Sequence, residues 1–475
     1  MELKHSYEAI VVGAGPVGLW LAAELRRYGV DVVVLERLAE PSQQIKAGSV
    51  GPSSAEIFDQ RGLLERFPAP DPGVLAALGT GRPLGHFAGL WLLRGAPELR
   101  TMPVFAQQSQ VEAVLESYAR ELGVPVLRGH EVTALAGDRV EVTRAGSATT
   151  VTGRFVVGCD GGRSTVRRLA GFGFEGTPAT ITGRQALVDI AGPNPLAKGW
   201  NRTGAGMIVY GPGPQRVLTV EFDGPPADRD RPLERAEIEA SLRRVSGTEV
   251  VVESLVTGTR WTDNTRLATT YRRGGVLLAG DAAHVHPPFG GQGLNLGFQD
   301  AANLGWKLAA TIAGWAPEGL LDTYGDERAP VAAAALANTR AQVALMRPDP
   351  QTSALRELFA DLLAYDEPNA HVSRLMTGVD RPYPMASDHP DAGRVAADRP
   401  VGSSRLYELL RTPGGLLLDA TADGAGARIA SAWAGRVSAV PGPENLLIRP
   451  DGVVAWGGAT LDGLDKALET WFGRP

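Results

Sequence analysis

The stretch Gly274–Lys307, GGVLLAGDAAHVHPPFGGQGLNLGFQDAANLGWK, predicts a strand, a glycine-rich loop and a helix in succession. Val276–Ala279 is an apolar run of the length and composition of a buried parallel strand. The run ends at Gly280-Asp281, and a helical pattern begins near Gly293. Backbone N–H groups at a helix start suit an anionic or electron-accepting group, and an acid at a strand end can accept hydrogen bonds from sugar-like hydroxyls. A lone Gly-Asp pair is more often an ordinary connection. Here it is accompanied by two further motifs.

The first of these motifs is a glycine turn near the start of the chain. Tyr7–Val12 has the pattern of a buried strand, and Gly13–Gly18, GAGPVG, has the spacing GxGxxG. A helical pattern over Leu19–Tyr28 follows, and then the apolar run Val30–Leu35, which ends in Glu36-Arg37. A GxGxxG turn between a strand and a helix, with an acid after the next strand, is specific for a dinucleotide.

The residues of this turn have separate expected roles. Gly13 permits the tight turn, Gly15 lets the backbone approach a pyrophosphate, and Gly18 lets the helix pack on the strand. Glu36 can hold the hydroxyl pair of a ribose. Because its carboxylate would repel a 2′-phosphate, we expect FAD or NAD at this turn, and not NADP.

Composition excludes several classes of protein. The chain has 475 residues, of which 44% are hydrophobic and 21% charged, as in a soluble protein of roughly three domains. The net charge of −6 argues against a nucleic-acid partner. Cys159 is the only cysteine, which favours a reducing cytoplasm. The apolar segment Ala9–Ala23 is too short to span a bilayer and is interrupted by glycines, so we expect no membrane segment.

The second accompanying motif is Phe155–Gly162, FVVGCDGG, another apolar run that ends in an acid and glycines. A hairpin is expected just before it, from Arg139–Thr143 and Thr149–Arg154. The GxGxxG-like run Gly171–Gly176 follows a helical pattern and opens none, so it is predicted to be a loop. The chain therefore offers one dinucleotide-binding fold.

The second half of the chain changes pattern twice. Residues 178–260 alternate between polar and apolar positions, which predicts a mostly antiparallel sheet with a helix near Glu234–Val245. Leu320–Ala337 and Ser353–Met376 are each predicted to be helical. Thr377–Pro400 is rich in Pro, Asp and Gly and has the composition of a linker, and the residues after it are expected to form a small α/β unit, in which the apolar run Leu416–Leu418 is predicted to be buried.

Taken in order, the three motifs resemble those of the FAD-dependent single-component aromatic hydroxylases, the group typified by para-hydroxybenzoate hydroxylase. The motifs are GxGxxG with Glu36-Arg37, then Cys159–Gly162, then Gly280-Asp281 with PPFGGQGLN. Trp261–Arg266 and Leu447–Trp456 are similar to segments of the aromatic polyketide hydroxylases of angucycline and anthracycline pathways.

The resemblance implies a fold of the α/β class with mixed α+β character. A Rossmann-like FAD-binding domain would comprise residues 1–175 and 261–380, and an antiparallel-sheet substrate domain residues 176–260 with 77–103. Residues 401–475 would form a thioredoxin-like C-terminal domain. Because this tail contains no cysteine, it cannot carry out disulfide chemistry.

The resemblance also implies particular site residues. Asp160 would serve the pyrophosphate and NAD(P)H, Asp281 the ribityl chain, and Gln108 the FAD side. Lys46 stands where members of the family usually have an arginine, and it would either contact a phosphate or lie in solvent. Phe289 stands where the family commonly has a threonine. The expected cofactor-binding residues are Gly13, Gly15, Pro16, Gly18, Glu36, Arg37, Lys46, Gln108, Asp160, Asp281, Pro288, Gly291, Gly293, Leu294 and Asn295, and the expected substrate-pocket residues are His86, Phe87, Trp91, Pro287, Phe289 and Gly290.

The implied activity is hydroxylation of an aromatic polyketide through a C4a-hydroperoxyflavin, with FAD as cofactor and NADPH or NADH and O2 as co-substrates. Two alternatives remain, a rifampicin-type monooxygenase and a flavin-binding protein without turnover. The expected partner is a small aromatic molecule, and the expected state is a monomer or homodimer. No catalytic residue is identified, no Ser-His-Asp order is present, and His284-x-His286 does not make a metal site plausible beside a proline-rich loop.

Overall fold

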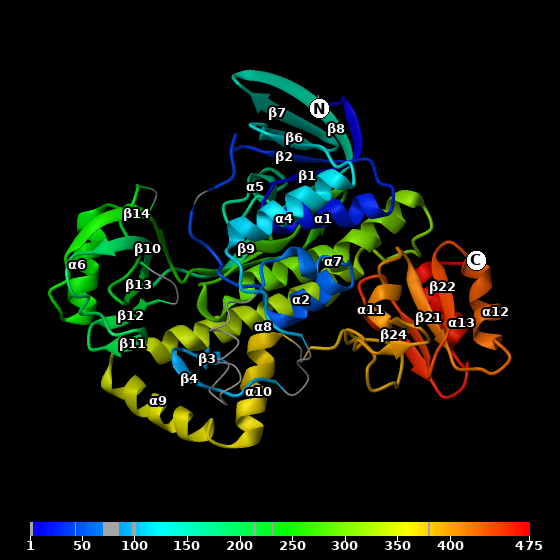
Figure 1. Cartoon of the computed structure of the whole chain (residues 1–475). Helices are drawn as coiled ribbons and strands as arrows, with labels where there is room; N and C mark the ends of the chain where they lie inside the picture. Colours follow the sequence, from blue (N-terminus) through cyan, green and yellow to red (C-terminus); the bar gives the residue numbers. More distant parts are fainter. Residues whose placement is uncertain are drawn as a thin grey trace.

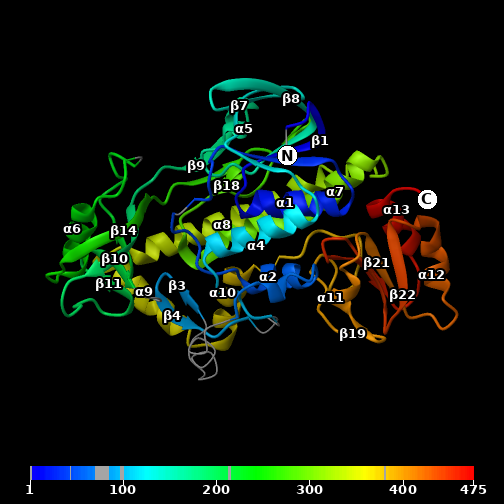
Figure 2. The same ribbon diagram turned by 45° about the horizontal axis from the view of Figure 1, so that its top comes forward.

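The computed structural model describes residues 3–42, 44–69, 85–96, 101–211, 215–229, 231–378 and 381–475. Three parts lie in a row (Figures 1 and 2). A central part contains the largest sheet and the longest helices, a second sheet lies at one end, and the C-terminal residues form a unit at the other end.

The central sheet is built from short apolar strands that pair in parallel. The glycine turn follows the first strand, which lies between the strands that end in Glu36 and Gly158. Both neighbours are parallel to it, and the paired segments 9–12, 32–35 and 155–158 are buried, which explains why these segments are apolar. The sheet has the order β16 (Arg272–Arg273), β17 (Val276–Leu278), β8 (Ser147–Gly158), β1 (Ser6–Val12), β2 (Val32–Glu36) and β5 (Val126–Arg128), and the hairpin of β6 (Glu131–Ala136) and β7 (Arg139–Arg144) extends it from β8.

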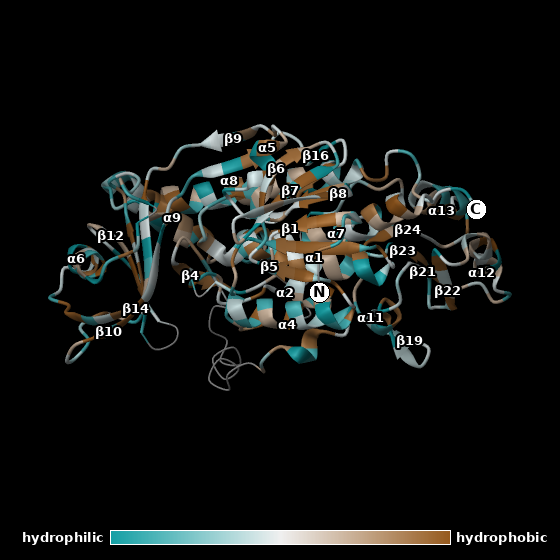
Figure 3. Cartoon of the chain, turned by 90° about the horizontal axis from the view of Figure 1, so that it is seen from above, coloured by the Kyte–Doolittle hydropathy of each residue, from teal (hydrophilic) through white to brown (hydrophobic). Residues whose placement is uncertain are grey.

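Helix α1 (Pro16–Arg27) packs against this sheet and against α7 (Gln292–Ala313). The brown colouring of β1, α1 and neighbouring segments in Figure 3 shows the apolar core that they share. The strand and the helix predicted within Gly274–Lys307 are confirmed, since β17 and α7 lie there. The remaining elements of this part are α2 (Pro52–Asp59), η1 (Leu64–Arg66), α4 (Gln108–Glu121), α5 (Thr165–Leu169), η2 (Gly280–Ala282), β18 (His284–Val285), η3 (Phe289–Gly291) and α8 (Thr323–Met346).

The second sheet is antiparallel throughout, as the alternating pattern of residues 178–260 predicts. One of its faces is covered by α6 (Arg235–Ser246), whose apolar residues Ile238, Leu242 and Val245 are buried against the sheet. The order is β11 (Gly199–Thr203), β12 (Gly206–Tyr210), β13 (Arg216–Glu221), β10 (Thr182–Ile190) and β14 (Val252–Trp261).

The chain crosses between the two sheets twice, and the two crossings are joined to each other. On the way out it forms β9 (Phe174–Thr177), and on the way back β15 (Thr265–Ala268). These strands pair antiparallel, and β15 also pairs with β18, which lies between β17 and α7. Asp263 adds a further tie, because its carboxylate accepts hydrogen bonds from the backbone N–H groups of Thr180 (2.6 Å) and Ile181 (3.1 Å). The crossing is therefore a three-stranded sheet and not a pair of free linkers.

A small helical layer lies beneath the second sheet and the central part. It contains the hairpin β3 (Gly85–Phe87) and β4 (Leu90–Leu93), with α9 (Pro350–Leu362) and α10 (Asp366–Thr377). The prediction of one helical run over Ser353–Met376 is wrong, because α9 ends at Leu362. Pro368 has no N–H to donate, which a first helical turn tolerates and a helix interior does not. Of the predicted range 77–103, residues 77–84 and 97–100 lie outside the described residues.

The C-terminal unit is a four-stranded mixed sheet with helices. Its first two strands are parallel and its last two form a hairpin, the arrangement expected of the thioredoxin-like unit. Leu416, Leu417 and Leu418 are all buried, as predicted from their apolar run. The elements are β19 (Pro400–Val401), β20 (Ser404–Arg405), α11 (Leu406–Leu409), β21 (Gly415–Asp419), α12 (Ala425–Ala430), η4 (Ser431–Trp433), β22 (Val437–Pro441), β23 (Asn445–Ile448), β24 (Val454–Gly458) and α13 (Leu464–Phe472), with sheet order β22-β21-β23-β24.

This unit is packed firmly against the central part. Trp306 and Ala310 of α7 share an apolar cluster with Trp471 and Phe472 of α13. The segment predicted to be a linker also packs against the unit where it is described, since Val395 pairs with Val453 in a β-bridge. Among the described residues, no helix is both long and apolar enough to cross a membrane.

Candidate active site

The glycine turn after β1 is shaped by close backbone packing at two of its three glycines. A Cβ atom placed on Gly18 would lie 2.0 Å from the carbonyl oxygen of Gly13, so α1 can approach the turn only without a side chain there. Gly13 has a φ of +107°, and a Cβ atom would lie 2.5 Å from the carbonyl oxygen of Cys159. Gly15 differs, because a Cβ atom there would meet nothing within 4 Å. Gly13 and Gly18 therefore serve the fold, whereas Gly15 leaves open space beside the backbone.

Glu36, at the end of β2, supports this turn directly. Its Oε2 accepts a hydrogen bond from the Ala14 N–H (2.8 Å), and its Oε1 accepts one from the Leu38 N–H (2.9 Å). Each carboxylate oxygen has two acceptor positions, so both can still accept a ribose hydroxyl. The sequence predicted that Glu36 would contact a ribose, but it gave no indication that Glu36 also supports the glycine turn.

Asp160 lies after β8 and caps a helix. Its Oδ2 accepts hydrogen bonds from the backbone N–H groups of Thr165 (2.6 Å) and Val166 (3.1 Å), and its Oδ1 accepts one from Ser164 Oγ (2.5 Å). The carboxylate thus holds the first turn of α5 beside the cavity. Its implied contact with pyrophosphate and NAD(P)H stays a prediction.

Asp281 is the carboxylate that the structure leaves free for a ligand. It follows β17, is exposed, lines the large cavity and accepts no hydrogen bond from the described part of the chain. Nearby, α7 begins after Gly291, which has a φ of +63°, and the N–H groups of its first turn have no partner within the helix. Gly291, Gly293 and Leu294 line the same cavity. A carboxylate and a positive helix terminus therefore face the same space.

One cavity of about 670 Å³ connects these elements with the second sheet. On one side it is lined by the glycine turn, Glu36 and Asp281. On the other it is lined by side chains that the sequence did not single out, chiefly Gln185, Trp200, Arg216, Leu218, Thr259 and Trp261. Their positions on one face of β10, β11, β13 and β14 could be found only once the register of the strands was known.

An aromatic cluster forms a wall of the cavity where its two sides meet. Phe289 is buried and packs edge-on against Trp261, with ring centroids 5.2 Å apart, and it also contacts Trp200 at 6.3 Å. His86 packs behind Trp200, with ring centroids 4.4 Å apart. Trp91 contacts His86 and is 47% exposed. Aromatic side chains of this kind suit a flat ring system.

Arg216 brings a positive charge to the cavity. Its guanidinium donates to the Lys46 carbonyl (3.4 Å), and no described carboxylate pairs with it. Burial lowers the pKa of Arg216, because the charged form loses contact with water. A cation held in this way is stabilised by an anionic ligand group.

Most, but not all, of the predicted residues meet at this cavity. Of the predicted cofactor set, Gly18 packs under the turn, and Asn295 ties the Gly51 N–H (2.8 Å) to the Gly291 carbonyl (2.8 Å) without lining the cavity. Of the predicted pocket set, only Phe289 lines it. The predicted residues on the lining are Gly13, Gly15, Pro16, Glu36, Arg37, Lys46, Gln108, Asp160, Asp281, Pro288, Phe289, Gly291, Gly293 and Leu294, and those outside it are Gly18, His86, Phe87, Trp91, Pro287, Gly290 and Asn295.

A parallel sheet with a glycine turn, an acid at the next strand end and a second acid beside a helix start defines a flavin-type dinucleotide-binding oxidoreductase. The open space at Gly15 and the unpaired Asp281 carboxylate fit the pyrophosphate and ribityl chain of FAD. Two family models match the chain, "FAD binding domain" over residues 6–339 and "Aromatic-ring hydroxylase, C-terminal" over residues 389–475. The chain belongs to the FAD-dependent aromatic-ring hydroxylases, and FAD is its cofactor.

Individual relatives span the whole chain. It is 41% identical to the 12-dehydrotetracycline 5-monooxygenase/anhydrotetracycline 6-monooxygenase of Streptomyces rimosus subsp. rimosus, over 99% of each chain. It is 40% identical to the rifampicin monooxygenase of Streptomyces venezuelae, over 98% of this chain and 99% of that one. The solved structure of anhydrotetracycline hydroxylase from Streptomyces rimosus matches with a TM-score of 0.89 at 39% identity, over 99% of this chain and 100% of that one.

Replacing Asp281 with alanine is expected to weaken FAD binding by about 1–3 kcal/mol, the cost of leaving ligand hydroxyls unpaired. The fold should be retained, because the carboxylate makes no hydrogen bond to the described protein. Titration of the apoprotein with FAD, followed by flavin fluorescence, measures the loss. Asp281→Asn keeps one oxygen acceptor and should lose less. Equal affinity in the wild type and Asp281→Ala would show that Asp281 does not contact the cofactor.

Proposed function

We propose that this protein is an NAD(P)H-consuming monooxygenase that hydroxylates an aromatic polyketide of the angucycline or anthracycline type. The observation that carries the proposal is the continuity of one cavity, which runs from the glycine turn and Asp281 to the aromatic wall of Trp200, Trp261 and Phe289. A ring bound against this wall lies in the same enclosed space as the reactive part of the cofactor.

The residues of the chain divide the work between them. Backbone at Gly15 would hold the pyrophosphate, Asp281 would hold the ribityl hydroxyls, and the start of α7 would favour negative charge on the bound cofactor. Bound FAD supplies the electron transfer and the activation of O2. The aromatic wall orients the substrate, and Arg216 is placed to pair with an ionised hydroxyl on it.

The runner-up is a monooxygenase that inactivates rifampicin. Overall identity does not separate the two, since the tetracycline-pathway relative is 41% identical and the rifampicin relative 40%. The aromatic side chains of the wall favour a planar fused-ring substrate over a bulky bridged one. We further propose that the protein works in the cytoplasm without a nucleic-acid partner, which the net charge of −6 and the single cysteine support, and that it is a monomer or homodimer.

The decisive test is NAD(P)H oxidation by the FAD-loaded enzyme against a panel of ring systems. We expect slow oxidation alone and a rise of roughly tenfold or more with the correct polyketide, equivalent to about 1.4 kcal/mol off the barrier. Ring binding would shift the population toward the state in which nicotinamide reaches the flavin. An angucycline-type tetracycle should stimulate oxidation and be hydroxylated. Stimulation by a rifamycin alone would support the runner-up, and no stimulation by any ring, with FAD bound, would support a flavin-binding protein without turnover.

Trp200 and Trp91 provide a matched pair of variants for the same assay. Trp200 lines the cavity, whereas Trp91 is exposed and reaches it only through His86. Trp200→Leu should weaken ring binding by about 0.5–1.5 kcal/mol, the value of an aromatic pair, and leave FAD affinity unchanged. Trp91→Leu should change neither. Equal effects of both substitutions would place the ring elsewhere.

A further inference from the structure

Asp300 holds the backbone turn that presents Asp281 to the cofactor. It lies on α7, is fully buried and accepts three hydrogen bonds. Its donors are the Gly280 N–H (3.0 Å), His284 Nε2 (2.7 Å) and Arg328 Nε (2.7 Å). Gly280 immediately precedes Asp281 and has a φ of +61°, a conformation open to glycine, and the hydrogen bond from its N–H to Asp300 fixes this peptide. The position of Asp281 therefore depends on Asp300.

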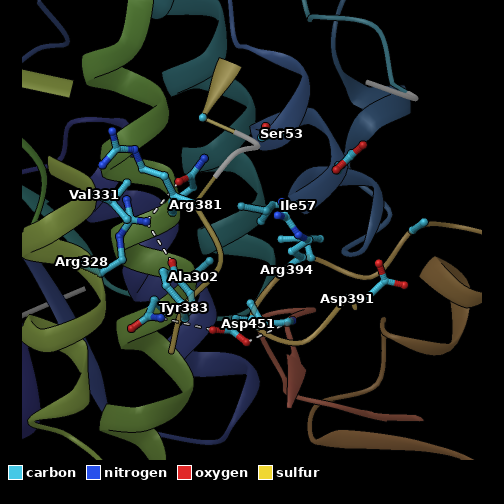
Figure 4. Close-up of a pocket in the computed structure, with 18 residues that line it drawn as sticks. Ser53, Ile57, Ala302, Arg328, Val331, Arg381, Tyr383, Asp391, Arg394 and Asp451 are labelled. Atoms are coloured by element: carbon cyan, nitrogen blue, oxygen red, sulfur yellow. Dashed lines mark hydrogen bonds between the residues drawn. The ribbon is translucent and has the colours of Figure 1, made fainter. Parts of the chain in front are cut away.

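Arg328, on α8, connects Asp300 by hydrogen bonds to Tyr383, which lies in the segment that leads into the C-terminal unit. Its Nη1 donates to the Tyr383 hydroxyl (2.9 Å) and to Gln299 Oε1 (3.2 Å), and its Nη2 donates to the Leu296 carbonyl (3.1 Å). Figure 4 shows Arg328 and Tyr383 at one side of a cavity of about 180 Å³, with Asp451 of the C-terminal unit also on its lining. A fully buried guanidinium with these fixed partners has little freedom to move.

The C-terminal unit contributes its own buried charge to the same place. Arg449 donates to both oxygens of Glu327 (2.7 and 2.9 Å), the residue next to Arg328 on α8. It also pairs with Asp451, and its guanidinium lies over the Tyr383 ring, 5.5 Å from the centroid. Glu327 in turn accepts a hydrogen bond from Lys307 of α7 (2.8 Å). The C-terminal unit thus fixes α8, α7 and Tyr383 relative to one another.

We propose that Arg449 and Tyr383 are positioning residues, through which the C-terminal unit sets the geometry of the Gly280-Asp281 turn and so the affinity for FAD. Neither residue lines the large cavity, so the effect passes through Arg328 and Asp300. A buried charge pair is weak evidence for net stability, and we infer that these pairs serve to define the local geometry. The proposal rests on FAD as cofactor and does not depend on which ring is hydroxylated.

The test is FAD affinity of the full-length apoprotein, which requires neither substrate nor NAD(P)H. Tyr383→Phe removes one hydroxyl and keeps the ring, and it should weaken FAD binding roughly three- to tenfold, in the range of measured coupling between sites. Tyr407→Phe is the matched control. Tyr407 is buried in the C-terminal unit and donates a hydrogen bond to the Ala396 carbonyl (3.1 Å), and in the described structure its hydroxyl interacts with Gln60 and not with Arg328 or Asp300.

A double-mutant cycle with Asp281→Ala separates positioning from general stability. If Tyr383 acts by placing Asp281, Tyr383→Phe should change FAD affinity by less than about twofold once Asp281 is absent. A role in stability alone would lower the melting temperature and leave the ratio of affinities the same in both backgrounds. Arg449→Lys, which keeps the charge and loses the two-pronged contact, should behave like Tyr383→Phe. Unchanged FAD affinity in both single variants, or equal effects in both backgrounds, would overturn the proposal.

Discussion

Gly15→Val is expected to abolish FAD binding while leaving the protein folded. A Cβ atom at Gly15 meets nothing within 4 Å, so a valine can be accommodated by the apoprotein. Its branched side chain would, however, fill the space where the backbone has to approach the pyrophosphate. The purified variant should be colourless, with the circular dichroism and unfolding curve of the wild-type apoprotein.

Gly18→Ala is the matched control for this result. A Cβ atom at Gly18 would lie 2.0 Å from the Gly13 carbonyl oxygen, so even alanine should disturb the packing of α1 on the turn. That variant should lose stability as well as FAD. A Gly15→Val protein that retains FAD, or one that is as unstable as Gly18→Ala, would contradict the assignment of Gly15 to the cofactor side of the turn.

The second large effect expected is a loss of stability in acid. Burial alone would raise the pKa of Asp300, but His284 and Arg328 outweigh it and hold the pKa at about 2. Burial would likewise raise the pKa of Glu327, but Arg449 and Lys307 hold it at about 2. The ordinary values of these groups are 3.8 and 4.5. Because both pKa values are lowered on folding, both carboxylates stabilise the protein above their unfolded-state values, each by about 2–3 kcal/mol.

This contribution should disappear as the pH falls from about 4.5 towards 2. Chemical unfolding followed over that range measures it, and FAD should be released in the same window, because Asp300 holds the Gly280-Asp281 turn. Asp300→Asn should be less stable at neutral pH by about 3–5 kcal/mol, since Arg328 is left buried without its carboxylate. Its stability should also fall less steeply in acid. A wild-type unfolding midpoint that stays constant across the window would exclude this role of the two carboxylates.

The parts of the fold that could be predicted from sequence are those in which a short segment carries its own constraint. Gly18 is required by its contact with the Gly13 carbonyl within one βαβ unit, so the motif spacing was sufficient evidence for it, whereas the contact of Gly13 with the Cys159 carbonyl joins segments far apart in the sequence. Asp281 was predicted because a strand, an acid and a glycine-rich helix start follow one another along the chain. Leu416–Leu418 were predicted to be buried from composition alone.

The parts that could not be predicted depend on residues far apart in the sequence. Arg449 meets Glu327 only because the C-terminal unit folds back on α8, and no local pattern marks either residue. Trp200 reaches the cavity through the register of an antiparallel sheet. The capping of α5 by the Asp160 carboxylate likewise depends on side-chain geometry and not on motif, and the contact of Asp160 with pyrophosphate and NAD(P)H stays a prediction.

The doubly paired crossing between the two sheets has a mechanical consequence. Lobes joined by free linkers can swing apart, but here β9, β15 and β18 are hydrogen-bonded to one another and Asp263 fastens the residues beside them. Separation of the lobes would have to break these backbone bonds in concert. The paired crossing is therefore expected to limit the movement of the two sheets relative to each other, so that the cavity between them would select molecules by size without a large opening motion.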